Sequence, residues 1–333
     1  MQILGMDIGH SAVKIAMTNA AGTPVRAIFP SVVCPAVEIS DDAERSRASQ
    51  EAVHVDGRSY FIGETATLQG RRSAVTGLNE HWISSPEYAA LLLGAWRSAA
   101  RLVGAPLADP MLVMGLPTHL FTRQRDALKQ IVARHLPVKA INLRVMPQSI
   151  APYQLAMFTP AGTPLPDRQM GQESWGVVEV GYFTSDFCLV QDGRWIEKAS
   201  GTCPGVRVAA EYLVRQIARR DLTVSLLEAE EALARGEIRH FGKRLDVRPE
   251  RELAVRMVID EVVDTATRLL GSYVRSLDGV IVAGGGGELV FAELQKRWPV
   301  CQLAENPRFA VAEGMRRFGA AFAGVWHPAA ASG

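Results

Sequence analysis

The sequence has little net charge, few cysteines and no long apolar run, and each of these absences excludes a class of protein. Its 36 basic and 35 acidic residues leave a net charge of +1, so no overall positive field favours nucleic acid. The four cysteines (Cys34, Cys188, Cys203 and Cys301) lie far apart and lack CxxC or zinc-ligand spacing. We therefore expect buried, inert thiols rather than a zinc site.

Signals for secretion and for membrane insertion are also missing. The first residues lack the basic flank and the apolar core of a signal peptide. The densest apolar stretch, residues 88–96, is too short to cross a bilayer. We therefore expect a cytoplasmic protein without membrane contact. With 333 residues, of which 48% are hydrophobic, the chain is long enough for two domains with cores of their own.

Residues 3–16 carry the most informative local pattern. An apolar run at 3–6 predicts a buried strand ending in Asp7, a tight turn with Gly9 and Ser11 follows, and a second apolar run returns. Backbone N–H groups in such a turn can face phosphate oxygens, and the carboxylate can hold a hydrated Mg²⁺. An Asp-x-Gly hairpin turn without a ligand explains the same residues, so this pattern alone leaves both interpretations open.

Apolar periodicity and turn residues place the other elements. Ser85 and Pro86 are typical of a helix start and Gly104 of a helix end. Residues 41–51 are charged and small, so we expect a surface loop. Strands are expected at 3–7, 13–18, 25–29, 53–62 (a hairpin broken at 56–57), 111–115, 141–146, 176–180, 186–191, 195–199 and 280–283, and helices at 86–103, 123–136, 152–157, 206–217 and 249–273.

Both halves of the chain open with an apolar strand, a glycine-containing turn and a second strand. Residues 159–172, rich in Pro, Gly and polar side chains, separate the halves as a linker. This weak internal repeat indicates a duplicated α/β unit with a cleft between the copies, which is a natural ligand site.

Three glycine-bearing turns occur in this arrangement, at residues 7–11, 179–186 and 280–288. Two strand–turn–strand loops can clamp phosphates between them. The glycine run of the third turn lets a base or ribose lie against the backbone without interference from Cβ atoms. Taken together, the three turns indicate a nucleotide site more strongly than any one of them.

With these turns in this order, the chain resembles the actin-like ATPases, in particular the bacterial plasmid-segregation ParM/StbA group. The matching segments are a first phosphate loop, a connecting segment, a second phosphate loop, an adenosine motif and a second connecting segment. The Gly115-Leu116-Pro117 region with Arg125 and Leu128 fits the same group, and the chain also resembles the ParM-like protein of a plasmid module known as PRTRC. The resemblance covers residues 3–320, with those five segments at 7–14, 145–153, 179–186, 280–288 and 306–319.

The resemblance implies an α/β actin-like ATPase fold, in which two ribonuclease-H-like domains flank a nucleotide cleft. The first domain would comprise residues 1–155 and 307–326, the second residues 156–306, and residues 327–333 would form a flexible tail. ATP or ADP would bind with Mg²⁺, held through water by Asp7 and Glu179. The implied nucleotide contacts are Asp7, Gly9, His10, Ser11 and Lys14, then Gly181, Tyr182, Phe183 and Thr184, and finally Gly205, Gly284, Gly285, Gly286 and Glu288.

Four positions depart from the family pattern. Glu179 stands where the family usually has Asp, and it could instead be a strand residue pointing away from the cleft. Tyr182 and Phe183 replace small residues and would crowd or partly cover the phosphates. Gln148 stands where the plasmid proteins usually have Glu. An amide cannot act as a general base at neutral pH, but it can orient an attacking water, so we expect slow hydrolysis with Gln148, Asp7 and Glu179 as the catalytic set.

The expected function is an ATPase that forms homopolymeric filaments and segregates a plasmid, with the DNA bound through a separate adaptor. Two alternatives remain open. A small-molecule kinase of the same superfold, such as a sugar kinase, would need a carboxylate base, for which Asp186 is the candidate. A scaffold that binds nucleotide without hydrolysing it is compatible with Gln148 and Glu179. Lys14 also has two interpretations, a phosphate ligand or a strand lysine that faces solvent.

Overall fold

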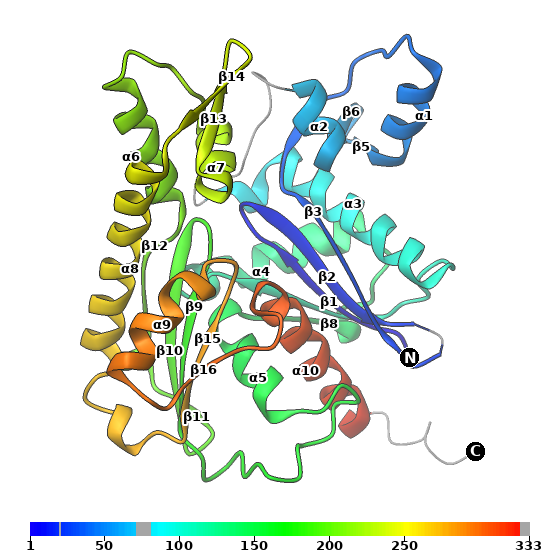
Figure 1. Ribbon diagram of the computed structural model, residues 1–333. Helices are drawn as coiled ribbons and strands as arrows, with labels where there is room; N and C mark the ends of the chain where they lie inside the picture. The colour runs from blue at the N-terminus through cyan, green and yellow to red at the C-terminus, as the bar shows by residue number, and fades with distance from the viewer. Residues whose placement is uncertain (20, 71–80, 327–333) are drawn as a thin grey trace. The chain divides into compact units, whose positions relative to one another are not determined.

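The computed structural model describes residues 1–19, 21–70 and 81–326, which form two compact units (Figure 1). Unit 1 contains residues 1–169 and the segment from Phe309 onward, and unit 2 contains residues 170–308. The chain therefore leaves unit 1 after residue 169 and returns to it at residue 309. The predicted tail at 327–333 lies outside the described residues.

Unit 1 is built on a five-stranded sheet with the strand order β3-β2-β1-β7-β8. The strands β1, β2 and β3 are paired antiparallel to one another, whereas β7 and β8 run parallel to β1. The predicted strands at the start of the chain are thereby confirmed. The bounds are β1 Ile3–Ile8, β2 Ala12–Thr18, β3 Pro24–Pro30, β7 Met111–Leu116 and β8 Leu143–Pro147.

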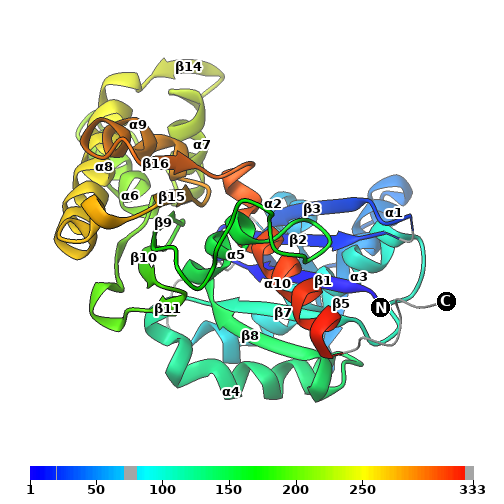
Figure 2. The ribbon, with the colours of Figure 1, turned by 90° about the horizontal axis from the view of Figure 1, so that it is seen from below.

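Helices cover both faces of this sheet, which is why every residue of β1 and β7 is buried (Figure 2). Leu4 and Met6 pack in one core with α3 and α4, and Ile3 and Val113 pack in another with α5 and α10. As predicted, the Ser85 hydroxyl caps α3 and Gly104 ends it with a φ of 67°. The bounds are α3 Pro86–Val103, α4 Thr118–His135, α5 Ala151–Met157 and α10 Ala310–Trp326, with short 3₁₀ turns η1 Trp82–Ser84, η2 Ala140–Asn142, η3 Gln148–Ile150 and η6 Pro307–Phe309.

A small three-stranded sheet with two helices completes unit 1, and one prediction fails there. The hairpin broken at 56–57 is confirmed, but residues 42–51 form a helix rather than a loop. Asp41 caps this helix and Ala48 is its buried residue, so the segment lies on the surface without an apolar periodicity that could reveal it. The bounds are β4 Val33–Pro35, α1 Asp42–Glu51, β5 Ala52–Val55, β6 Arg58–Ile62 and α2 Gly63–Gly70.

Unit 2 repeats the frame of unit 1. Its sheet has the order β11-β10-β9-β15-β16, with β12 also paired to β10, and again an antiparallel hairpin is followed by two parallel strands. The strand predicted at 195–199 is wrong, because the extended part ends at Trp195 and a 3₁₀ turn follows. The strand bounds are β9 Trp175–Val180, β10 Thr184–Gln191, β11 Arg194–Trp195, β12 Gly201–Pro204, β15 Gly279–Ala283 and β16 Cys301–Leu303.

The helices of unit 2 confirm two predictions and add elements that the apolar pattern did not show. The helices predicted at 206–217 and 249–273 correspond to α6 and α8, and the latter ends at Leu270. Between them lie a short helix and a two-stranded hairpin. The bounds are η4 Glu197–Ala199, α6 Arg207–Ala218, α7 Leu226–Arg235, β13 Glu237–His240, β14 Lys243–Asp246, α8 Arg248–Leu270, η5 Val274–Ser276 and α9 Gly287–Arg297.

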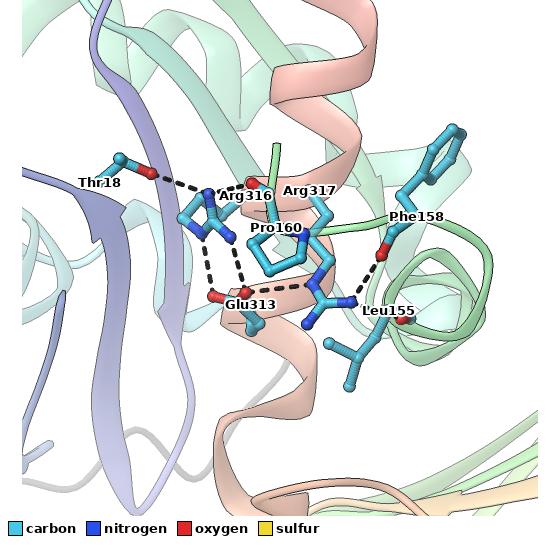
Figure 3. Close-up of polar contacts among 7 residues, drawn as sticks. All are labelled: Thr18, Leu155, Phe158, Pro160, Glu313, Arg316 and Arg317. Atoms are coloured by element: carbon cyan, nitrogen blue, oxygen red, sulfur yellow. Dashed lines mark hydrogen bonds and ion pairs between the residues drawn. The ribbon is translucent and has the colours of Figure 1, made fainter. Parts of the chain in front are cut away.

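A buried ion cluster fixes α10 inside unit 1 (Figure 3). Arg316 and Glu313 are 1% and 2% exposed and share two hydrogen bonds, of 2.7 and 2.9 Å. Arg316 also donates to the Thr18 hydroxyl at 2.8 Å and to the Pro160 carbonyl at 2.9 Å. Burial acts to raise the pKa of Glu313, but the hydrogen bonds and charges of Arg316 and Arg317 outweigh it and hold that pKa below its usual value.

The same cluster explains where the chain leaves unit 1. Arg317 donates to the carbonyl oxygens of Leu155 and Phe158, at 3.0 and 2.5 Å, and so caps the end of α5. Gly162 lies against the backbone of α10, where a Cβ would be 2.3 Å from the Ala321 nitrogen. These contacts hold residues 158–162 to unit 1, and unit 1 extends to residue 169, whereas the family resemblance implies a second domain that begins at residue 156.

Two further sequence predictions concern the whole chain. The four cysteines are buried free thiols, as expected, and burial raises the pKa of Cys203 to about 11 and of Cys301 to about 12. None of the helices in the described part of the chain has the length and apolar character needed to cross a membrane.

Candidate functional site

Asp7, near the end of β1, is a buried carboxylate held by two donors of unit 1. Its exposed fraction is 2%. Lys14 Nζ lies 2.9 Å from Oδ2, and Gln148 Nε2 donates to Oδ1 at 2.8 Å. Lys14 is the cross-strand partner of Asp7 in the β1–β2 register, and its side chain is only 14% exposed. The structure therefore places Lys14 against the carboxylate and not in solvent.

The turn after Asp7 is fixed by a residue distant in sequence. The Ser31 hydroxyl donates to the Gly9 carbonyl at 2.5 Å, and the Ser31 N–H donates to the Ser11 carbonyl at 3.0 Å. A Cβ at Gly9 would lie 3.1 Å from the Ala12 carbonyl oxygen and 3.4 Å from Lys14 Nζ. Glycine thus keeps the surface beside the lysine clear, as a turn that receives phosphate oxygens requires.

Gln148 reaches Asp7 because the strand beside it carries a glycine. Gln148 begins η3 directly after β8, and Gly115 lies on the neighbouring strand β7. A Cβ at Gly115 would lie 2.7 Å from Gln148 Cγ and 2.1 Å from Met315 Cε. With Nε2 committed to Asp7, Oε1 is the atom of Gln148 that can accept a hydrogen bond from a water.

Aromatic side chains surround the first turn from within unit 1. The His10 ring lies 4.7 Å from the Trp82 ring, and Trp82 makes an edge contact with Tyr88 at 5.3 Å. Burial raises the pKa of Tyr88, and the negative charge of Asp7 raises it further. His10 therefore contributes its ring to a packed aromatic cluster.

Unit 2 presents a second hairpin with the same turn length. Val180 pairs with Ser185 across its four-residue turn as Ile8 pairs with Val13 in unit 1. Glu179 occupies the position of Asp7 and is 8% exposed. Its cross-strand neighbour is Asp186, which is buried and accepts a hydrogen bond from the Thr184 hydroxyl at 2.8 Å.

Gly205 and Gly284 let the segments that contain them lie directly against this second turn. A Cβ at Gly284, where φ is +88°, would lie 2.3 Å from the Val180 carbonyl oxygen and 2.6 Å from Glu179 Oε1. A Cβ at Gly205 would lie 2.5 Å from the carbonyl oxygens of Gly181 and Tyr182. The Glu179 carboxylate therefore lies against the glycine run instead of pointing away from it.

Within the glycine run 284–287, the exposure differs from one residue to the next. The Gly286 N–H donates to the Val180 carbonyl at 2.9 Å, whereas Gly285 is exposed. Glu288 is an exposed residue in the first turn of α9. The N-terminus of α9 therefore follows the glycine run directly, and Glu288 lies at its solvent side.

Tyr182 and Phe183 are both engaged within unit 2. The Tyr182 hydroxyl donates to the Glu230 carboxylate of α7. The pKa of Tyr182 is raised, with burial as the largest cause and this carboxylate as the next. The Arg207 guanidinium lies over the Phe183 ring, 5.2 Å from its centroid, and forms an ion pair with Glu211. The large residues of the second turn are thus anchored to α6 and α7.

Two sequence models of known families match this chain. Residues 5–149 match the actin-like proteins N-terminal domain, and residues 177–296 match the C-terminal domain of the archaeal, MreB-like actin homologue. The chain is an actin-like protein. No curated protein matches its sequence.

Solved structures agree with this actin-like fold. One is a 15-stranded ParM filament from Clostridium botulinum, with a TM-score of 0.74, 20% identity and coverage of 96% of this chain and 98% of that one. Another is an archaeal actin homologue, with a TM-score of 0.72, 19% identity and coverage of 95% and 98%. ParM of Bacillus thuringiensis, solved with ATP, has a TM-score of 0.62, 15% identity and coverage of 98% and 99%. At these identities the likeness establishes the fold.

The side chains of this actin-like protein fit a hydrated Mg²⁺ better than a directly bound metal ion. The described residues contain no group of three or more His, Cys, Asp or Glu side chains that could hold a metal. Mg²⁺ usually keeps several waters and is bound by one or two carboxylates and by phosphates. Each Asp7 oxygen accepts one hydrogen bond in the structure and has a second lone pair for a metal-bound water.

Some residues around the two turns were not predicted from the sequence. Ser31, Trp82 and Tyr88 come from segments without a nucleotide-binding pattern and are brought to the first turn by the fold. Arg207 follows Gly205 by two residues, so a search for cations just after the turn-associated glycine could have found it. Glu230 gives no local signal.

Proposed function

We propose that this chain binds ATP with Mg²⁺, hydrolyses it slowly and assembles into filaments that segregate a plasmid. The observation that carries the proposal is the buried Asp7 carboxylate held between Lys14 and Gln148 beside a glycine turn. Such an arrangement has a cation for phosphate oxygens, a carboxylate for a hydrated metal and an amide for a water.

Each residue has a distinct role in this proposal. Lys14 would bind a phosphate oxygen with the N–H bonds that its contact to Asp7 leaves unused. Asp7 in unit 1 and Glu179 in unit 2 would hold Mg²⁺ through its waters, and the metal would neutralise charge on the phosphates. Gln148 would orient the attacking water. Gly205, Gly284, Gly285 and Gly286 would leave room for the ribose and base, with Glu288 at the edge.

Filament formation is supported by the comparisons with solved structures. The ParM from Clostridium botulinum was solved as a filament, and a structure of the archaeal actin homologue contains ADP. For this chain, head-to-tail association of identical copies would give open filaments. Plasmid DNA would be bound through a separate adaptor, because a net charge of +1 gives no general affinity for DNA.

Electron microscopy and sedimentation test the proposal directly. Purified protein with Mg²⁺ and a non-hydrolysable ATP analogue is expected to form filaments and to pellet, whereas protein with EDTA is not. If nucleotide binds but no polymer forms at any accessible concentration, the filament part is wrong and a nucleotide-dependent scaffold is favoured. Phosphate release stimulated by a sugar, without polymer, would favour a kinase, although the burial of Asp186 and its bond to Thr184 argue against a base there.

Gln148→Ala tests the hydrolytic role alone. We expect the rate of phosphate release to fall about 10- to 100-fold, because the water loses its orienting acceptor. The affinity for the non-hydrolysable analogue should stay within about twofold, because Asp7 keeps its bond to Lys14. Single-turnover phosphate release and isothermal titration give the two quantities. A variant that hydrolyses ATP as fast as the parent would show that Gln148 does not position the water.

A further inference from the structure

The hairpin β13–β14 carries an exposed aromatic residue at its tip. Residues 237–246, here named the tip hairpin, form a two-stranded sheet that projects from α7 and α8 (Figure 1). Phe241 stands at the turn and is 94% exposed. The large apolar side chain therefore contributes almost nothing to the core of its own chain.

Phe241 also occupies an unfavourable backbone conformation. Its φ is +45° and that of Gly242 is +79°, as in the two-residue turns that favour Asn-Gly or Asp-Gly. A bulky residue is rare in this left-handed region, and Asn tolerates it much better. Phe241 thus departs from the burial that is usual for a large apolar residue and from the residue types that are preferred in such a turn. Local departures of this kind are expected at functional positions, such as a residue that binds a partner.

Basic side chains flank the aromatic tip. Arg239, Lys243 and Arg244 are exposed, and Arg244 is paired with Glu237 at 3.1 Å. The ring of His240 packs edge-on against Phe241 at 4.5 Å. A partner that covers the tip hairpin should therefore offer an apolar recess with an acidic border.

Unit 1 of the same chain has a recess that offers an acidic border and one large apolar side chain. Between α1 and α2 lies a cavity of about 420 Å³, here named the α1–α2 pocket. Leu68, one of its lining residues, is 67% exposed. Three glutamates line the pocket against two arginines, and these are Glu44, Glu51, Glu64, Arg47 and Arg101.

We propose that the tip hairpin of one copy docks into the α1–α2 pocket of a second copy. Phe241 would fill the recess and cover Leu68, while Lys243 and Arg239 would face the glutamates. The contact would remove two of the most exposed apolar side chains of the described chain from water. This inference rests on the proposed self-assembly and assigns a specific interface to it.

Phe241→Asn tests the anchor, because it improves the turn while it removes the ring. We expect urea unfolding to show equal or greater stability than in the parent. The critical concentration for pelleting with Mg²⁺ and the ATP analogue should rise at least about tenfold, as for an aromatic interface anchor. Ile141→Asn, at an exposed apolar position of unit 1, is the matched control and should leave the critical concentration unchanged.

A charge exchange tests the pocket. Lys243→Glu and Glu64→Lys should each raise the critical concentration severalfold, because each places like charges together across the interface. Mixing the two variants, or combining both changes in one chain, should restore at least half of the lost assembly. Rescue identifies this pair of surfaces, whereas general effects of charge would add up instead of cancelling.

The outcomes separate this inference from the proposed function. If the parent protein does not polymerise, the filament proposal and this interface fail together. If the parent polymerises and Phe241→Asn polymerises equally well, only the interface is wrong. Phe241-dependent sedimentation with anionic vesicles or single-stranded DNA, with unchanged self-assembly, would also overturn it. The inference would also be overturned if the contact between the tip hairpin and the α1–α2 pocket formed independently of protein concentration.

Discussion

The hairpins β1–β2 and β9–β10 share a turn length and strand pairing but differ in what faces the first carboxylate. Across from Asp7 stands Lys14, whereas across from Glu179 stands Asp186. The first carboxylate is therefore balanced by a cation of its own hairpin before any ligand arrives. The second lies opposite another acidic residue, and like charges in that position are unfavourable. Two hairpins with the same backbone pairing can thus present carboxylates in different electrostatic surroundings, one beside a cation and one beside another acid.

The two hairpins are also anchored at different places. The end of β2 is tied through Thr18 to the buried Arg316, far from the turn. The second hairpin is tied at the turn itself, through Tyr182 to Glu230 of α7. A disturbance of α10 should therefore affect the stability of unit 1, whereas a disturbance of α7 should act on the second turn directly.

Arg316→Met should give the largest effect and would test the anchor of the first hairpin. Removal of Arg316 takes two hydrogen bonds from the buried Glu313 and leaves it the ion pair with Arg317, so we expect a loss of about 3 kcal/mol in the free energy of unfolding. Arg256→Met, which breaks the surface pairs with Asp260 and Glu293 in unit 2, is the matched control and should lose far less stability. Urea unfolding at pH 7 measures both. Equal losses would mean that the buried cluster is no stronger an anchor than a surface pair.

The parent protein and Arg316→Met can also be compared as a function of pH. Because the folded-state pKa of Glu313 lies below its ordinary value of 4.5, the cluster stabilises the fold above about pH 4.5. That stabilisation is lost as the pH falls through the lower, folded-state pKa. The stability difference between the parent and Arg316→Met should therefore be constant from pH 7 to about 5 and should shrink below 4.5.

Asp7→Asn and Glu179→Gln compare the two carboxylates. We expect Asp7→Asn to weaken Mg²⁺-dependent nucleotide binding about 100-fold, because it removes the charge that we propose to hold the hydrated metal and removes the charged partner of Lys14. Glu179→Gln should cost about tenfold, because its longer side chain is not paired with a lysine in its hairpin. Titration with and without Mg²⁺ measures both. Equal losses would show that the two halves contribute alike.

Tyr182→Phe should have the smallest effect and tests the anchor of the second turn. Loss of the hydrogen bond to the Glu230 carboxylate should cost about 1 kcal/mol in unfolding free energy. Nucleotide affinity should fall only a fewfold, because the backbone of the turn keeps its bonds from Gly205 and Arg207. Tyr273→Phe, at a half-buried tyrosine of unit 2, is the control. Unchanged stability would mean that α7 does not hold the turn.

Local sequence signals predicted much of the fold because strong periodicity and caps coincide in many elements. The strands around Asp7 and Glu179 and the capped helix α3 are of this kind. The helix α1 was missed because its buried side is a single alanine. Its charged and polar residues therefore show no apolar periodicity of a helix. The short strand β12 was missed because it has no strand pattern of its own in the sequence and is defined by its pairing with β10.

The candidate site was predictable as a set of segments but not as a geometry. Asp7 and Gln148 are 141 residues apart, and nothing in either local pattern shows that the amide donates to the carboxylate. The position of Glu179 against Gly284 likewise depends on the parallel pairing of β9 with β15. The anchors Ser31, Trp82 and Glu230 arise from tertiary packing, which a single sequence does not encode in any short window.

The distance in sequence between α10 and the rest of unit 1 has a consequence for folding during translation. Unit 2 is one uninterrupted segment, but unit 1 needs a helix that begins at Ala310. Gly5 and Gly314 let that helix touch β1 and α5 so closely that no other side chain could fill the gap. During translation, unit 2 should therefore be complete before unit 1, and residues 1–169 must wait, with part of their apolar surface uncovered, until residues 310–326 have left the ribosome.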